Sequence, residues 1–367
     1  MWQSLTCDTQ LNSLRTMKLR CLFTVITLIL MPVTATAVKV PGLYEAQVSV
    51  ADQQVDSRQQ AIKFAMRAVL VKLTGDRNTS GQLALLPIID RAEYFVLQYR
   101  YLEDRGVADE LGNIPIRLKL GVQFDEANLN NVLRDLGIPV WGRERPSVLV
   151  WIAMQDETSR QILDLETKPE FFRTLDEIAN ARGIAPIFPL FDLEDASNIR
   201  ASDIWGGFSL PVFEASRRYH ADSILVGRIE LSAPGIWEGR WTVFIGEDST
   251  TWTTEGVYPE ALLEEGINGV TDILASRFGQ STVYTESGEL DVTVIDIFSV
   301  DQYARTLQYL QSLSTVNNVQ VTYVNEGRVD FRITALGGER SVAQAINFGR
   351  ILEVEKQASG ITYRLLP

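Results

Sequence analysis

The sequence predicts a mixed α+β and α/β protein built from three small domains. Its 367 residues exceed what one hydrophobic core ordinarily serves. Three stretches each carry their own succession of strand-type and helix-type patterns, and a proline-containing segment separates the first two. We therefore expect a signal peptide over 1–37, a linker over 142–146, and domains over 38–141, 147–280 and 287–367.

The first predicted domain opens with a strand and a long helix. Residues 43–50 alternate as in a strand. Asp56 or Ser57 can cap the helix that follows, and Gly75 ends it, since glycine tolerates a left-handed backbone. The apolar face of this helix has spacings of 4, 3 and 4 and consists of Ile62, Met66, Val69 and Leu73.

A long hairpin and a final helix complete this domain. Its strands are expected at 94–102 and 116–124, with a polar loop over 104–113 between them. The last helix runs from Asp125 to Gly137. The order of elements is therefore β-α-(α)-β-β-α, a small α+β module. Pro139, Gly142 and Pro146 then disfavour regular structure and stiffen the connection.

The second predicted domain alternates strands and helices and then forms an antiparallel meander, which indicates a mixed sheet covered by helices. The continuous apolar run at 148–153 is typical of a buried strand. Further strands are expected at 185–191, 224–231, 237–245 and 250–254. Helices are expected at 171–182, 213–220 and 259–278.

The third predicted domain has the order β-α-β-β-α-β, which is that of ferredoxin-like folds. Alternation at 290–294 marks its first strand, and the Asn325-Glu326-Gly327 turn separates the two central strands. The first helix has one apolar face formed by Tyr303, Leu307, Leu310 and Leu313.

The first 37 residues have the features of a secretory signal peptide. Basic residues precede an apolar run at 22–33, which ends in the small-x-small pattern Ala35-Thr36-Ala37. A run of about 12 residues is shorter than the roughly 20 that span a bilayer. We expect a periplasmic protein without a transmembrane span after cleavage. An uncleaved inner-membrane anchor and a start at Met17 are the alternatives.

Charge and cysteine content restrict the function classes. Removing three basic residues and one acidic residue from 34 and 47 leaves 31 and 46, a net charge of −15. So acidic a chain is a poor partner for nucleic acid, which is itself a polyanion. Both cysteines, Cys7 and Cys21, precede the expected cleavage site, so the mature chain has no thiol for catalysis, a disulfide or a metal.

Three segments of the first domain resemble an uncharacterised proteobacterial envelope family, number two thousand and sixty-six in the series of domains of unknown function. They are Pro41–Ala46, Ala61–Leu73 and Thr74–Asn78. The resemblance extends over most of the mature chain. It implies export, and it carries no active residue over to this sequence.

Catalytic and cofactor motifs do not stand out. His220 is the only histidine, and zinc normally takes three or four protein ligands, so a structural role at a helix end is favoured. No nucleophile elbow, phosphate loop or dinucleotide fingerprint is recognisable. We expect no cofactor.

The sharpest enzymatic hypothesis rests on carboxylates at the carboxyl ends of two strands of the second domain, where open α/β sheets commonly bind ligands. Such carboxylates can hold a hard cation or divide acid and base roles. Acidic loops of an acidic protein are the structural alternative. The candidates are Asp156, Asp192, Glu194 and Asp195, with Glu157 and Asp203 nearby.

Tryptophans offer a second kind of ligand site. Trp205 precedes two glycines in an expected loop, which makes it the best candidate for an exposed, ligand-binding aromatic residue. Trp237, Trp241 and Trp252 lie in the meander, where core packing is favoured over a sugar-stacking platform.

Three functions follow as hypotheses. The first is an exported, non-enzymatic envelope protein that acts as an interaction or assembly module with an envelope protein partner. The second is a periplasmic ligand-binding protein or metal-dependent hydrolase that uses the acidic loops. The third is a sugar-binding module.

Overall fold

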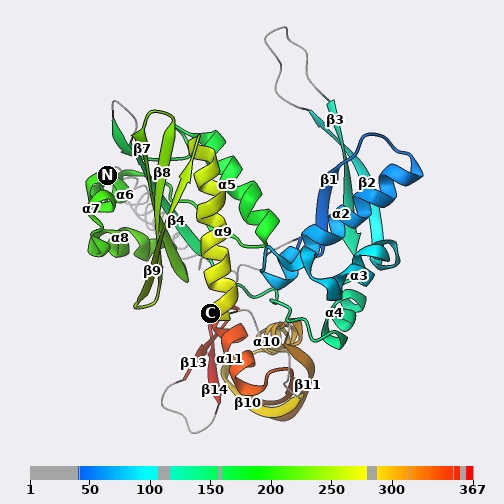
Figure 1. Cartoon of the computed structure of the whole chain (residues 1–367). Coiled ribbons are helices and arrows are strands. Elements are labelled where there is room, and N and C mark those ends of the chain that lie inside the picture. Colours follow the sequence, from blue (N-terminus) through cyan, green and yellow to red (C-terminus); the bar gives the residue numbers. More distant parts are fainter. Residues whose placement is uncertain are drawn as a thin grey trace, which may run out of the picture. The chain divides into compact units, whose positions relative to one another are not determined.

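The computed structural model describes residues 40, 42–105, 116–155, 159–278, 287–313, 315–349, 351–355 and 361–366, all of which belong to one compact unit of the chain. Within these residues, ten α-helices and three sheets form a mixed α+β structure (Figure 1). The predicted fold class is confirmed, and each sheet has its own buried apolar cluster.

The first sheet has the order β1-β3-β2, with β1 (Glu45–Ser49), β2 (Val96–Arg105) and β3 (Ile116–Phe124) antiparallel throughout. One face packs on α2 (Val55–Thr74), whose apolar stripe is buried as its spacing predicts. Helices α3 (Leu86–Asp90) and α4 (Glu126–Asp135) complete the module.

The ends of these helices test the predicted caps. Gly75 has φ of 73° and ends α2, as predicted. Asp125, where the last helix of this domain was predicted to begin, is the N-cap of α4 and accepts a hydrogen bond from Asn128 N. The N-cap of α2 was predicted wrongly. It is Gln54, one residue before the helix, and neither Asp56 nor Ser57 holds that position.

The second sheet has the order β5-β4-β7-β8-β9, with β6 (Pro186–Ile187) paired to β4. Strands β4 (Val148–Gln155) and β7 (Ser223–Ala233) are parallel, and β8 (Ile236–Ile245) and β9 (Asp248–Gly256) continue as an antiparallel meander. A short strand, β5 (Arg160–Ile162), pairs antiparallel to β4.

Both faces of this sheet are covered. Helices α5 (Pro169–Arg182) and α9 (Pro259–Phe278) bury one face, and α6 (Leu193–Asn198), α7 (Ala201–Gly206) and α8 (Ser209–Ser216) bury the other (Figure 1). Trp241 lies in the first of these cores, fully buried, as its position on the apolar strand face predicts.

Two predictions for this region are corrected. The apolar run at 185–191 forms a strand of only two residues, because Pro189 has no N–H to donate and Phe191 has a positive φ of 50°. The stretch before α8, predicted as loop, folds into α6 and α7 instead. Asp192 and Asp203 support these helix starts by accepting main-chain hydrogen bonds.

The third sheet has the order β11-β12-β10-β14-β13. Its elements are β10 (Gly288–Ile297), α10 (Val300–Ser312), β11 (Val316–Asn325), β12 (Gly327–Ala335), α11 (Gly338–Gly349), β13 (Leu352–Val354) and β14 (Thr362–Leu365). The predicted β-α-β-β-α-β succession is present with one addition. The short β13 precedes the last strand, and β14 therefore runs parallel to β10.

The connection between the first two sheets is buried and hydrogen-bonded. Trp141 N donates to Leu73 O at 2.6 Å, near the C-terminal end of α2. Arg145, 2% exposed, donates to the carbonyls of Lys72 and Gly183 at 2.7 Å each, and its guanidinium lies 4.3 Å from the Trp141 ring centroid. A cation thus satisfies otherwise unpaired carbonyls at the C-terminal ends of α2 and α5.

A second buried arginine joins the same helices. Arg182, the last residue of α5, donates to Gly75 O at 2.8 Å and to Asp272 Oδ1 at 2.6 Å. Arg77, just after α2, pairs with Asp272 and Glu265 of α9. These contacts hold α5 beside the first sheet.

Candidate functional site

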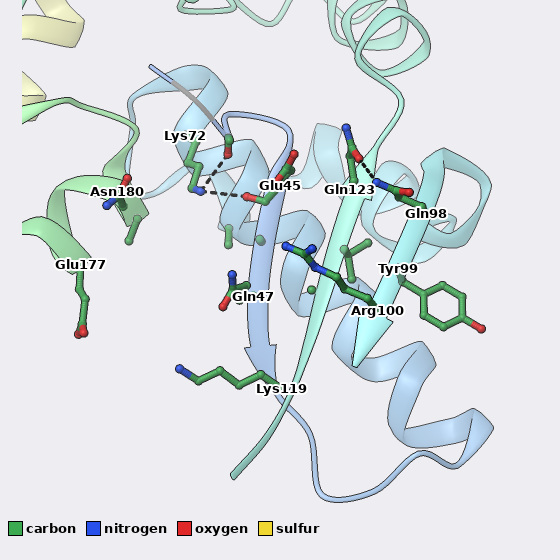
Figure 2. A pocket seen from close by; sticks show the side chains of 16 residues that line it. Glu45, Gln47, Lys72, Gln98, Tyr99, Arg100, Lys119, Gln123, Glu177 and Asn180 are labelled. Carbon is green, nitrogen blue, oxygen red and sulfur yellow. Dashed lines mark hydrogen bonds between the residues drawn. The ribbon is translucent and has the colours of Figure 1, made fainter. Parts of the chain in front are cut away.

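The open face of the first sheet forms a groove of about 770 Å³ (Figure 2). Strands β1, β3 and β2 provide its floor, and residues 177, 180 and 181 of α5 provide one wall. The groove exists because α2 covers only the opposite face of the sheet, and the two buried arginines fix α5 at its side.

Strand alternation decides which side chains enter the groove. On each strand, every second residue packs under α2, and the residues between point to the open face. Two cross-strand rows result. One row is Glu45, Gln123 and Gln98, and the next is Gln47, Gly121 and Arg100.

Gly121 is the only glycine in the middle of β3, and it shapes the centre of the floor. Figure 2 shows the Arg100 side chain extending from β2 across β3 toward β1. A Cβ at Gly121 would stand 3.6 Å from Arg100 Cγ and 3.5 Å from Leu102 Cδ1, which are ordinary van der Waals contacts. A larger side chain would therefore fill the groove without requiring the sheet itself to move.

The groove is more basic than the chain as a whole. Lys72, Arg100 and Lys119 line it together with two carboxylates, Glu45 and Glu177. Arg100 is exposed and forms no ion pair with any residue that the structure describes. In a chain of net charge −13, this surplus favours ligands with negative groups.

Lys72 is a structural cation at the rim. Its Nζ donates to Glu45 O at 2.9 Å and to Gly42 O at 3.2 Å. Burial lowers the pKa of Lys72. Because both hydrogen bonds use the ammonium as donor, they hold the charged form and tie the start of β1 to α2.

Amide side chains supply the other polar groups. Gln98 Nε2 donates to Gln123 Oε1 across the two strands, and Gln47 and Asn180 face the groove from β1 and α5. A carboxamide both donates and accepts hydrogen bonds, as does a peptide group. The arrangement can therefore bind main-chain groups of an extended chain and, through Arg100, a carboxylate.

Sequence reasoning missed this groove. Its signals were present as polar residues alternating with core residues in β1 and β2, and as a glycine inside a strand, which often marks close approach by another group. What the sequence does not reveal is that the wall comes from α5, in a different predicted domain.

Of the predicted carboxylates, the three that the structure describes lie together around Arg218. Asp192 caps α6, and Arg218 donates to both of its oxygens. Asp195 is fully buried and accepts from Phe191 N and Tyr219 Oη. Glu194 lies 3.5 Å from Arg218. Asp156, with Glu157, lies outside the described residues.

These contacts give the acidic residues a structural explanation. Arg218 and two main-chain donors lower the pKa of Asp192 to about 2. Burial and the hydrogen bond to Asp195 raise the pKa of Tyr219 to about 12. Among the described residues, no three histidine, cysteine, aspartate or glutamate side chains are grouped to ligate one metal ion.

Trp205 was predicted to be an exposed loop residue, and this prediction was wrong. It lies within α7 and is partly buried, with Arg160 at 4.2 Å and Arg228 at 5.9 Å from its ring centroid. His220 is exposed and ends a 3₁₀ turn with φ of 49°. Residues 106–113 of the predicted polar loop lie outside the described residues.

None of the described helices combines the length and apolar character that crossing a bilayer requires.

Comparison with known proteins finds a matching family model and similar solved structures. Residues 37–142 match the model of a domain of unknown function, DUF8605. This match agrees with the expectation of an uncharacterised family. The matched family has a different number from the family named above. The matched segment contains the whole floor of the groove.

One such structure is the C-terminal domain of LpoB from Salmonella enterica, at 13% identity and a TM-score of 0.19. The similarity covers 30% of this chain and 80% of that one. No curated protein matches the chain.

Proposed function

We propose that this protein is an exported, non-enzymatic envelope protein that acts as an interaction module, and that the groove on its first sheet binds a partner. The observation that carries the proposal is the groove itself, open on a sheet face and lined by amides, cations and a central glycine. We propose an extended polypeptide segment with acidic side chains as its ligand.

The lining explains this choice of ligand. The carboxamides of Gln47, Gln98 and Asn180 can pair with the main chain of a segment lying along the sheet. Arg100, without an ion-pair partner among the described residues, suits a carboxylate. Arginine and lysine keep their protons at neutral pH, so these groups are better suited to binding than to proton transfer.

Export is the second part of the proposal and rests on the sequence. The basic residues before the apolar run at 22–33 and the pattern Ala35-Thr36-Ala37 support it. Mass spectrometry of the N-terminal peptide from an envelope fraction tests it. A peptide that starts at Val38 is expected, and a protein retained with residues 1–37 in the cytoplasm would contradict it.

Site-specific photo-crosslinking tests the groove. A photoreactive amino acid replaces Gln47 in the groove or, as a matched control, Gln320, an exposed glutamine of β11. We expect a discrete crosslinked species in envelope preparations from position 47 and none from position 320. Equal labelling from both positions, or none from either, would count against the groove as a binding surface.

A further inference from the structure

Two arginines of the second sheet lie beside Trp205, and a third lies opposite one of them on the next strand. They come from three strands, with Arg160 on β5, Arg228 on β7 and Arg240 on β8. Arg228 and Arg240 are directly opposite each other across the strands. Arg228 also lies opposite Ala153, near the carboxyl end of β4. Open α/β sheets commonly bind ligands at this end of parallel strands.

The described contacts of these arginines are with neutral groups. Arg160 donates twice to Gln155 Oε1, at 2.9 and 2.6 Å. Arg228 donates to the carbonyl of Trp205. Arg240 is exposed and has no hydrogen bond or ion pair within the described chain. Among the described residues, no carboxylate therefore pairs directly with them.

Arg228 and Arg240 form a like-charge pair across adjacent strands. Like charges directly opposite each other on adjacent strands destabilise a sheet. Burial, together with Arg240 and Arg160, lowers the pKa of Arg228. Glu230 and Glu238 also lie opposite each other on the same two strands. Their negative charges attract the Arg228 guanidinium and partly offset the lowering of its pKa, although neither glutamate forms an ion pair with the arginines among the described contacts.

We propose that Arg228, Arg240 and Arg160 form a binding site for an oxyanion, a phosphate or carboxylate group, next to Trp205. Opposed residues of an antiparallel pair have Cβ atoms about 5 Å apart, so both guanidinium groups can reach one oxyanion. Guanidinium matches such groups through paired hydrogen bonds. The site lies outside the groove, so its test is independent of the proposed function.

Isothermal titration calorimetry of the mature chain at low ionic strength tests the site with two probes, inorganic phosphate and a triglutamate peptide. The variants are Arg240→Gln and Arg160→Gln. The matched control is Arg332→Gln, an exposed strand arginine paired with Asp291 in the third module. Circular dichroism checks folding, and Arg240→Gln should not lower the unfolding temperature, because it removes repulsion from Arg228.

We expect saturable binding of at least one probe, weakened by about tenfold or more in each test variant, since hydrogen bonds to charged groups contribute on this scale. The control should bind as the wild type does. Tighter binding of phosphate would identify the ligand group as a phosphate ester. Tighter binding of triglutamate would identify it as an acidic side chain. Absence of saturable binding, or equal binding by the test variants and the wild type, would overturn the proposal.

Discussion

Replacing Arg145 by alanine should strongly destabilise the connection between the first two sheets. The side chain donates four hydrogen bonds to main-chain carbonyls, and hydrogen bonds from a charged donor contribute about 1.5–3 kcal/mol each. The cost of burying the cation reduces this total of roughly 6–12 kcal/mol. Burial lowers the pKa of Arg145 to about 9, which corresponds to roughly 5 kcal/mol. The difference is a net loss of about 1–7 kcal/mol, and we expect a value near its middle, about 4 kcal/mol.

Urea unfolding followed by tryptophan fluorescence and circular dichroism measures this loss. Trp141 is a useful reporter because the Arg145 guanidinium lies against its ring. Arg134→Ala, at an exposed position of α4, is the control and should change the free energy of unfolding by less than about 0.5 kcal/mol.

Arg145→Met separates hydrogen bonding from packing, because methionine fills much of the same volume without donors. We expect it to be nearly as destabilising as alanine, since the carbonyls of Lys72 and Gly183 then lose the arginine donors in the interior. If Arg145→Met is as stable as the wild type, the cost of burying the cation outweighs its hydrogen bonds, and the reasoning is refuted.

Two further predictions concern the second sheet. Asp192→Asn should lower the unfolding midpoint modestly at pH 7 and have a much smaller effect near pH 2. The depressed pKa of Asp192 contributes stability above its unfolded value of 3.8, and this contribution is lost as the pH falls through about 2. An equal effect at both pH values would contradict this. Gly266→Ala should cost about 1–3 kcal/mol, because its Cβ would lie 2.6 Å from the buried Trp241 ring. Thermal unfolding measures this cost, and an unchanged midpoint would show that the ring can yield.

Much of the fold could be predicted from local patterns. Residues 259–278 form a helix and 116–124 a strand, as predicted, because amphipathic periodicity and flanking turn residues agree there. The predicted strand at 185–191 was wrong. Its apolar residues pack in different directions, with Phe188 against Phe172 of α5 and Ile187 against the core on the other face of the sheet. Apolar content alone does not distinguish such a loop from a strand.

The groove could not be predicted because it depends on tertiary contacts. Gln47, Arg100 and Asn180 are separated in sequence and meet only when the sheet register and the position of α5 are set. The acidic loop residues were predicted as a site from their chemical type. In the structure, Asp192 and Asp195 accept hydrogen bonds from Arg218, which lies more than twenty residues away in the sequence.

Gly121 allows the most direct test of the groove as a binding surface. Gly121→Leu places a side chain on the floor of the groove and displaces Arg100, and its Cβ meets no contact shorter than 3.5 Å. Gly288→Leu is the matched control, at the first residue of β10, where the nearest atom would be 4.0 Å away. The measurement is the yield of the crosslinked species from position 47 in each background. We predict that Gly121→Leu abolishes it, whereas Gly288→Leu leaves it unchanged; an unchanged yield in folded Gly121→Leu protein would contradict the assignment of the groove as the partner-binding surface.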